Sequence, residues 1–257
     1  MKRTIITSAL LLLLGSPLLA QQDYYEVDNS LLVGTWYDTD GASITFEADG
    51  TTDYMNDVTY RFLPWQGSLT IYTCDGRIKQ MLQVTQASDN NLVINEYNGT
   101  TFTVFHKYLP MEAINLFLPS GTLWASNNLG AHFKNDIGDY YTWDEAAAAI
   151  TAMCGSEWRL PTSAEVQELI DETNGYYTEE DGVNICRVRT MTTPLTLDLP
   201  ATGYKRDETL QDPGSGYFWV SDDDSSQAYI LKFDSDGNLT KESTAKTDKL
   251  VIRPVKK

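Results

Sequence analysis

Histidine and cysteine are scarce in this chain of 257 residues, and their scarcity narrows its chemistry. Two histidines and three cysteines are present. The cysteines form no Cys-x-x-Cys pair, and neither His106 nor His132 has a Cys or Glu companion at the spacing of zinc ligands. We therefore predict no metal site and no cofactor. No Gly-x-Ser-x-Gly sequence occurs and no particular pair of carboxylates stands out, so we predict that the chain is not an enzyme.

Basic residues are also few. The sequence has 19 Lys and Arg against 36 Asp and Glu, which gives a formal net charge of -17. Such an acidic chain repels nucleic acid and anionic lipid, so we predict neither as a partner. After the N-terminal region no apolar run approaches the roughly 20 residues that span a bilayer, and we predict no transmembrane segment in the mature chain.

The N-terminal residues have the order of a secretory signal. Lys2 and Arg3 precede an apolar run over 5–14, and small residues lead to Ala20. We predict a signal peptide over 1–20 that is cleaved after Ala20, with an uncleaved anchor as the alternative. The mature protein is then extracytoplasmic, whether secreted, periplasmic or associated with the cell surface. There is no cysteine near the cleavage point, so we do not expect a lipid anchor at that position.

Outside the cytoplasm a pair of cysteines can oxidise. Cys154 and Cys186 fall in the same half of the chain, whereas Cys74 lies in the other half. We therefore favour a Cys154–Cys186 disulfide, and three free thiols are the alternative.

Residues 21–30 are polar and are expected to form a flexible N-terminus. From 31 to 107 the chain consists of short strand patterns separated by turns. Residues 43–47 alternate apolar and polar side chains, as in a half-buried strand. Asp-Gly and Asn-Gly pairs, which tolerate the positive φ of hairpin turns, occur at 49–50, 75–76 and 98–99. Further strands are expected at 58–62, 69–72, 81–84, 92–96 and 102–106, which predicts a small all-β antiparallel barrel or sandwich.

Residues 108–112 are predicted to be a linker, and the pattern changes beyond them. Capping boxes at Thr142–Glu145 and Thr162–Glu165 predict the starts of two helices. Strand patterns then follow at 217–220, 228–233 and 249–255. Residues 113–257 therefore form an α+β domain, and the fold class of the whole chain is α+β.

The first domain carries a family resemblance. Gly34-Thr35-Trp36 is followed by the stretch Ile44-Thr45-Phe46-Glu47-Ala48-Asp49-Gly50-Thr51. This resembles the short lipocalin-like domains of exported Bacteroidetes proteins. The resemblance covers 31–107 and implies a barrel with Trp36 closing one end.

The second domain resembles the Fibrobacter succinogenes major paralogous domain, over 113–256. The matching stretches agree in order and spacing, and they are Leu123–Ala131, Gly138–Trp143, Trp158–Thr162, Leu199–Tyr204, Gly216–Ser221 and Ile252–Val255. The resemblance implies a C-type lectin-like fold. It implies no particular function, because this fold carries many unrelated roles.

The calcium site of true C-type lectins is expected to be absent. Their Trp-Asn-Asp strand is replaced here by Trp219-Val220-Ser221, and no Glu-Pro-Asn sequence occurs. Asp234–Asn238 has the acidic spacing of a calcium loop, but no Glu closes it, and we predict a hairpin turn. Trp158–Thr162 is also similar to a motif of formylglycine-generating enzymes. Those enzymes need a C-terminal cysteine pair, and this chain has no cysteine after Cys186.

Exposed aromatic side chains are the remaining candidates for binding, because they offer a flat apolar face with a polar edge. We select Tyr204 and Tyr217, together with Asp222 and Asp223 in the acidic stretch that follows. The resulting hypothesis is an exported binding or adhesion protein that recognises a glycan or a protein through the lectin-like domain. The alternatives are a carrier of small ligands in the barrel and a structural component of the cell envelope.

Overall fold

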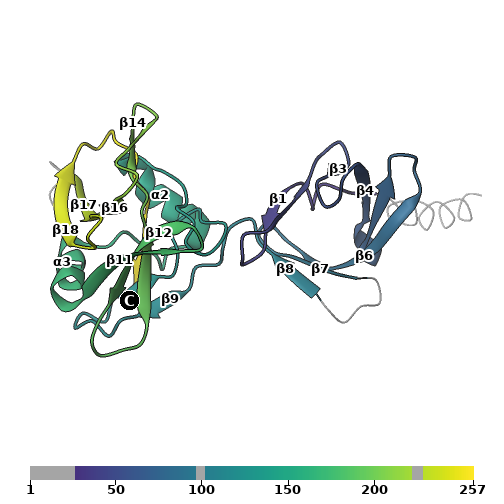
Figure 1. The fold of residues 1–257 in the computed structure, drawn as a ribbon. Helices are drawn as coiled ribbons and strands as arrows, with labels where there is room; N and C mark the ends of the chain where they lie inside the picture. The colour runs from purple at the N-terminus through teal and green to yellow at the C-terminus, as the bar shows by residue number, and fades with distance from the viewer. Residues whose placement is uncertain (1–26, 97–101, 222–227) are drawn as a thin grey trace, which may run out of the picture. The chain divides into compact units, whose positions relative to one another are not determined.

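The structure is a computed structural model, and it describes residues 27–96, 102–221 and 228–257 (Figure 1). It is mostly β, and the chain divides after Lys107 into two compact units. Four of the predictions lie outside the described residues. They are the signal peptide over 1–20, most of the flexible N-terminus, the turn at 98–99 and the acidic residues Asp222 and Asp223.

The first unit is one antiparallel sheet whose eight strands follow each other in chain order. The strands are β1 (Gly34–Tyr37), β2 (Ser43–Phe46), β3 (Thr51–Thr52), β4 (Val58–Leu63), β5 (Ser68–Thr73), β6 (Ile78–Ala87), β7 (Leu92–Glu96) and β8 (Phe102–Phe105). A 3-10 turn, η1 (Pro64–Gln66), joins β4 to β5. Tyr37 and His106 exchange two backbone hydrogen bonds of 2.8 Å, so the first strand meets the end of the last. The sheet is therefore barrel-like and nearly closed, as the alternating pattern predicted.

The barrel interior is filled by its own side chains. In β4 the side chains of Val58, Tyr60 and Phe62 are buried, and the two between them are exposed. This is the period of two that a sheet with one buried face requires. Every strand from β1 to β7 except β3 contributes to one apolar cluster, whose members are Leu32, Trp36, Ile44, Phe46, Val58, Tyr60, Phe62, Leu69, Ile71, Leu82, Val84, Leu92 and Ile94.

Trp36 is fully buried in this cluster. Its indole Nε1 donates to the Leu32 carbonyl oxygen at 2.7 Å. The Lys107 ammonium lies 4.7 Å from the centre of the indole ring, at cation–π distance. These contacts join the segment before β1 and the segment after β8 to the same side chain.

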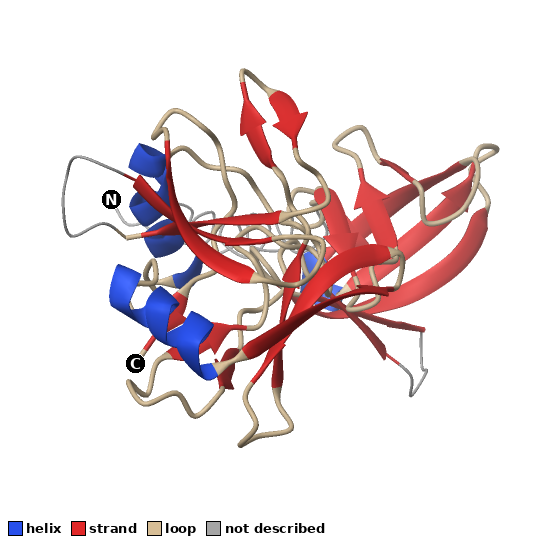
Figure 2. Cartoon of the chain, turned by 60° about the vertical axis from the view of Figure 1, so that its left-hand side comes forward, coloured by secondary structure: helices blue, strands red, loops and turns tan. Residues whose placement is uncertain are grey.

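The second unit combines two helices with short antiparallel strands. The helices are α2 (Trp143–Cys154) and α3 (Ser163–Glu172). The strands form three sheets and one separate hairpin (Figure 2). They are β9 (Ala113–Asn115), β10 (Leu123–Ala125), β11 (Asn174–Glu180), β12 (Val183–Arg189), β13 (Thr196–Pro200), β14 (Tyr204–Arg206), β15 (Thr209–Gln211), β16 (Gly216–Val220), β17 (Ala228–Phe233), β18 (Leu239–Thr244) and β19 (Val255–Lys256).

Both helices begin at the predicted capping residues. The Thr142 amide donates to the Glu145 carboxylate at 2.8 Å, and Thr162 makes the corresponding bond with Glu165 at 2.9 Å. These bonds satisfy amide groups that have no partner within the helix. Neither helix in the described residues is both long and apolar enough to cross a membrane.

Strand β16 separates two apolar clusters, because its alternate side chains face opposite ways. Phe218 and Val220 pack in one cluster with α3 and the β11–β12–β13 sheet. Tyr217 and Trp219 pack in the other cluster with α2. The strand is buried over its whole length, so both halves of the unit depend on it.

Two sequence predictions need correction in this unit. The strand expected at 249–255 is a buried extended segment that makes single bridges from Leu250 and Val251, and only β19 at its end is a strand. In the predicted linker, the Leu109 amide donates to the Ala131 carbonyl at 2.6 Å, so that segment is bonded to the second unit.

The predicted Cys154–Cys186 disulfide is wrong, because the thiols of Cys74, Cys154 and Cys186 are all free. Cys186 is buried on β12 beside the Gly237 carbonyl, in the cluster that contains α3. Cys154 ends α2 and packs against the other cluster. The two thiols belong to different cores, although they lie in the same half of the sequence.

Candidate functional site

The β14–β15 hairpin projects from the second unit (Figures 1 and 2). Its two-residue turn is Asp207-Glu208, with φ of 50° and 59°. Both values lie in the left-handed region, as in the turn type that favours Asn-Gly. Asp212, just after β15, has φ 44°, so this hairpin holds three of the seven described non-glycine residues with positive φ. Such strain persists only where surrounding contacts enforce it, and it gathers at functional sites.

Contacts from the segment at 248–249 enforce the hairpin conformation. The Arg206 guanidinium donates to both carboxylate oxygens of Asp248, at 2.9 and 2.8 Å. Lys205 and Lys249 exchange two backbone hydrogen bonds of 2.9 Å, and the Lys249 ammonium also pairs with Glu208. The hairpin is therefore attached at its first strand and at its turn.

The two tyrosines selected from the sequence meet at the base of this hairpin. The ring centres of Tyr204 and Tyr217 lie 4.9 Å apart, with the rings tilted by 52°. Tyr217 is only 9% exposed, and its hydroxyl donates to the Asp212 carboxylate at 2.7 Å. Burial raises the pKa of the Tyr217 hydroxyl, and the bond to Asp212 raises it further. Tyr217 therefore supports Tyr204 from within, and it is not the exposed side chain that we expected.

One face of the hairpin carries varied binding groups. Residues directly opposite each other in a hairpin point to the same side, and the pairs here are Tyr204 with Gln211 and Arg206 with Thr209. The Arg206 side chain is 54% exposed, and its guanidinium lies 5.2 Å from the Tyr204 ring centre. An aromatic ring, a guanidinium, a hydroxyl and an amide thus lie together, and the half-buried Tyr204 also packs against the cluster that contains α2. We call these four residues the hairpin face.

Of this face, only Tyr204 was predicted from the sequence. The Asp207-Glu208 turn carries no Gly or Asn, so no local signal marked the hairpin. The alternation of Tyr204 with Arg206, on the same side of a strand, was the one available signal.

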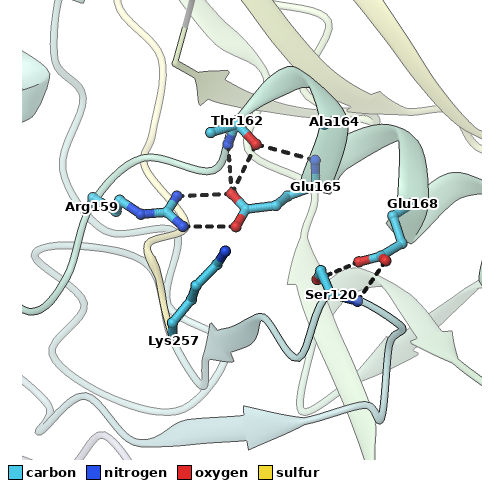
Figure 3. A pocket seen from close by; sticks show the side chains of 7 residues that line it. All are labelled: Ser120, Arg159, Thr162, Ala164, Glu165, Glu168 and Lys257. Carbon is cyan, nitrogen blue, oxygen red and sulfur yellow. Dashed lines mark hydrogen bonds and ion pairs between the residues drawn. The ribbon is translucent and has the colours of Figure 1, made fainter.

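A second feature is a pocket of about 280 Å³ beside the start of α3 (Figure 3). It is lined by Ser120, Arg159, Thr162, Ala164, Glu165, Glu168 and Lys257. None of these was a predicted site residue, although Thr162 and Glu165 were predicted as the cap of a helix, and the bond between Ser120 and Glu168 joins positions 48 apart in the sequence. Trp158 and Leu160, which flank Arg159, are buried.

Glu165 and Arg159 form the wall of this pocket. Two guanidinium nitrogens lie 2.7 and 2.8 Å from the two carboxylate oxygens. The Glu165 carboxylate also accepts hydrogen bonds from Thr162 and Thr122. Burial by itself would raise the pKa of Glu165, but these bonds outweigh burial and lower it to about 2. The carboxylate is therefore ionised throughout the physiological range.

The described residues contain no group of three or more His, Cys, Asp and Glu side chains that could hold a metal ion. Asp234–Asn238 forms the turn between β17 and β18, as predicted, and the Asp234 carboxylate accepts from the Asn238 amide at 2.9 Å. Its oxygens therefore stabilise the turn itself.

Comparisons of the chain with models of protein families, with curated proteins and with solved structures give no match.

Proposed function

We propose that this chain is an exported, non-enzymatic binding protein that recognises a glycan through the hairpin face. One observation carries the proposal: a strained, projecting hairpin is fixed in place while Tyr204 and three polar side chains point to the same side. A fixed site loses little entropy on binding, which favours affinity. Aromatic faces stack on sugar rings, and amide, hydroxyl and guanidinium groups match sugar hydroxyls.

The same features support binding without calcium. The four groups of the hairpin face include no carboxylate, and Asp248 behind them is occupied by Arg206 and Thr244. Calcium requires six to eight oxygen ligands. We therefore expect binding in the presence of EDTA.

The proposed domain identities rest on the resemblances described above. Trp36, buried between the segments before and after the sheet, supports a lipocalin-like barrel in the first unit. Two capped helices followed by the central strand β16 support a lectin-like second unit. The packed barrel interior gives the alternative of small-ligand carriage no support.

A glycan array with the purified mature chain tests the proposal. We expect selective binding that survives EDTA and is lost in Tyr204→Ala. Tyr176→Ala is the matched control, because Tyr176 is 38% exposed on β11 and outside the hairpin. An array without selective binding would contradict the glycan proposal and favour a protein partner or a structural role. Equal binding by both variants would contradict the assignment of the site.

Export is tested separately. When the full chain is expressed with residues 1–20 in a Gram-negative host, we expect the recovered protein to lie outside the cytoplasm and to begin at Gln21. Recovery of the uncleaved chain from the cytoplasm would contradict the proposal.

A further inference from the structure

The pocket beside α3 contains one neutral ion pair that needs no ligand. The Glu165 carboxylate accepts two bonds from Arg159, two from Thr162 and one from Thr122. Two carboxylate oxygens offer about four acceptor positions, so this group is fully used. Any ligand in the pocket must bind to the remaining groups.

Two other charged side chains of the pocket can still form hydrogen bonds or ion pairs with a ligand. Glu168 accepts from the Ser120 amide at 2.8 Å and from the Ser120 hydroxyl at 2.6 Å, and about two acceptor positions remain. Lys257 is exposed, and within the described ranges its ammonium makes no hydrogen bond or ion pair. Figure 3 shows it extending toward the space between Glu165 and Ser120.

The fold fixes where Lys257 lies. Strand β19 pairs antiparallel with β10, and Lys256 lies opposite Leu123. The next position in this register brings Lys257 beside Thr122, and Ser120 precedes it in the chain. Glu168 reaches the same place from α3, one turn after Glu165. The Lys257 ammonium and the Glu168 carboxylate, which both have hydrogen-bonding capacity left, therefore face one pocket from different elements.

Arg159 adds donors at the rim. Nη1 donates to Leu160 and Glu165, and Nη2 donates once to Glu165. The second Nη2 proton and the Nε proton have no partner in the described residues, and the side chain is 41% exposed. Donors thus lie near Lys257, and spare acceptors lie at Glu168.

We propose that this pocket binds a small zwitterion, such as a free α-amino acid. Its carboxylate is held by Lys257 and the spare protons of Arg159, and its ammonium is held by Glu168. The side chains that line the pocket include two cations and two carboxylates. A simple anion in the pocket would be repelled by the Glu168 carboxylate, and a simple cation would be repelled by the Lys257 ammonium. A zwitterion can pair with both groups. A volume of about 280 Å³ suits a ligand of this size.

This site is separate from the hairpin face, and the inference does not depend on the glycan proposal. Isothermal titration calorimetry of the mature chain tests it with the twenty free L-amino acids, each measured singly. Acetate, methylammonium and D-glucose are measured in parallel. We expect at least one amino acid to bind, and its methyl ester and its N-acetyl derivative to bind about tenfold more weakly or not at all.

Variants then locate the site. Lys257→Met and Glu168→Gln each weaken binding by about tenfold or more, because each removes a charged hydrogen bond. Gln retains an acceptor for Ser120, so α3 stays in place. Lys79→Met and Glu172→Gln are the matched controls, since both residues are exposed and outside the pocket. We expect these controls to bind as the unmodified chain does.

Three results would overturn the inference. The first is that no amino acid binds at concentrations up to about 10 mM, which corresponds to a negligible affinity. The second is that the ester, the N-acetyl derivative, acetate or glucose binds as tightly as the amino acid. The third is that the pocket variants and their controls bind alike.

Discussion

Arg206 and Asp248 are 42 positions apart in the sequence and form a two-point ion pair, with Nε 2.9 Å from Oδ1 and Nη2 2.8 Å from Oδ2. The Asp248 side chain is 2% exposed, whereas the Arg206 side chain is 54% exposed. A buried carboxylate therefore orients a guanidinium that remains accessible on the hairpin face. This geometry matches the planar fork of arginine and could not be reproduced by lysine.

Replacing Asp248 by Asn removes this support. We expect Asp248→Asn to lower the free energy of unfolding by about 1–3 kcal/mol, because Arg206 loses its charged acceptor. The Arg206 pair lowers the pKa of Asp248, and the bond from Thr244 adds to this. A lowered folded pKa contributes stability above the unfolded pKa, and that stability is lost as the pH falls through the folded pKa. Urea denaturation at pH 7 and at pH 3 measures the free energy of unfolding of Asp248→Asn and of the unmodified chain. We expect the difference between these two free energies to be smaller at pH 3.

The exposed Asp236→Asn is the control for this prediction, because Asp236 lies in the turn between β17 and β18. We expect no change in stability beyond about 0.5 kcal/mol. If both variants unfold at the same urea concentration as the unmodified chain, the pair does not hold the hairpin.

Glu165 predicts a second dependence on acid. Its pKa falls from 4.5 to about 2 in the folded protein. The associated stability is complete above about pH 4.5 and is lost as the pH falls through 2, and its size is about 3 kcal/mol. We expect Glu165→Gln to lower the free energy of unfolding by about 3 kcal/mol at pH 7 and by much less near pH 2.5. If the free energies of unfolding of Glu165→Gln and the unmodified chain differ equally at both pH values, this role of Glu165 is contradicted.

The barrel was predictable from the sequence because its signals are local. Alternation in residues 43–47 and the turn at 49–50 depend on neighbouring residues, and they correspond to β2 and the β2–β3 connection. The two capping boxes are equally local, and both helices begin where they indicate. Side-chain period and cap chemistry therefore predicted the first unit and the helices of the second.

The sites were not predictable, because each joins segments that are distant in the sequence. Arg206 meets Asp248 only after β14 pairs with β15, and Lys257 comes to line the same pocket as Ser120 only through the register of β10 and β19. The disulfide prediction failed for the same reason. Proximity in the sequence does not show which of two cores a cysteine will enter, and β16 separates the cores of Cys154 and Cys186.

Arg253 predicts the largest loss of stability in the second unit. Its guanidinium is 1% exposed and donates to three uncharged acceptors, which are Asn128 Oδ1 at 2.7 Å, the Ala125 carbonyl at 3.0 Å and the Asp198 carbonyl at 2.8 Å. Each buried acceptor that loses its donor costs about 1 kcal/mol or more. We expect Arg253→Met to lower the free energy of unfolding by about 3 kcal/mol or more, measured by urea denaturation.

Arg253→Lys separates charge from geometry. Lysine keeps the charge, but its single ammonium cannot reach three acceptors that lie in different directions. We expect a loss close to that of Arg253→Met. The control is Arg77→Met, because the Arg77 side chain is 85% exposed and its loss should cost no more than about 0.5 kcal/mol. If Arg253→Lys is as stable as the unmodified chain, the charge and not the three-way geometry is what matters.

The cysteines give a prediction that distinguishes free thiols from a disulfide. Cys74 is exposed in the turn between β5 and β6, and Cys154 is half-buried at the end of α2. Burial raises the pKa of the Cys154 thiol, and burial together with Asp234 and Asp198 raises the pKa of Cys186 to about 12. Because the thiolate is the reactive form, we expect iodoacetamide at pH 8 to modify Cys74 rapidly, Cys154 slowly and Cys186 only after unfolding. Mass spectrometry of the unfolded, unreduced protein should then find three alkylated cysteines, and a single one would restore the Cys154–Cys186 disulfide.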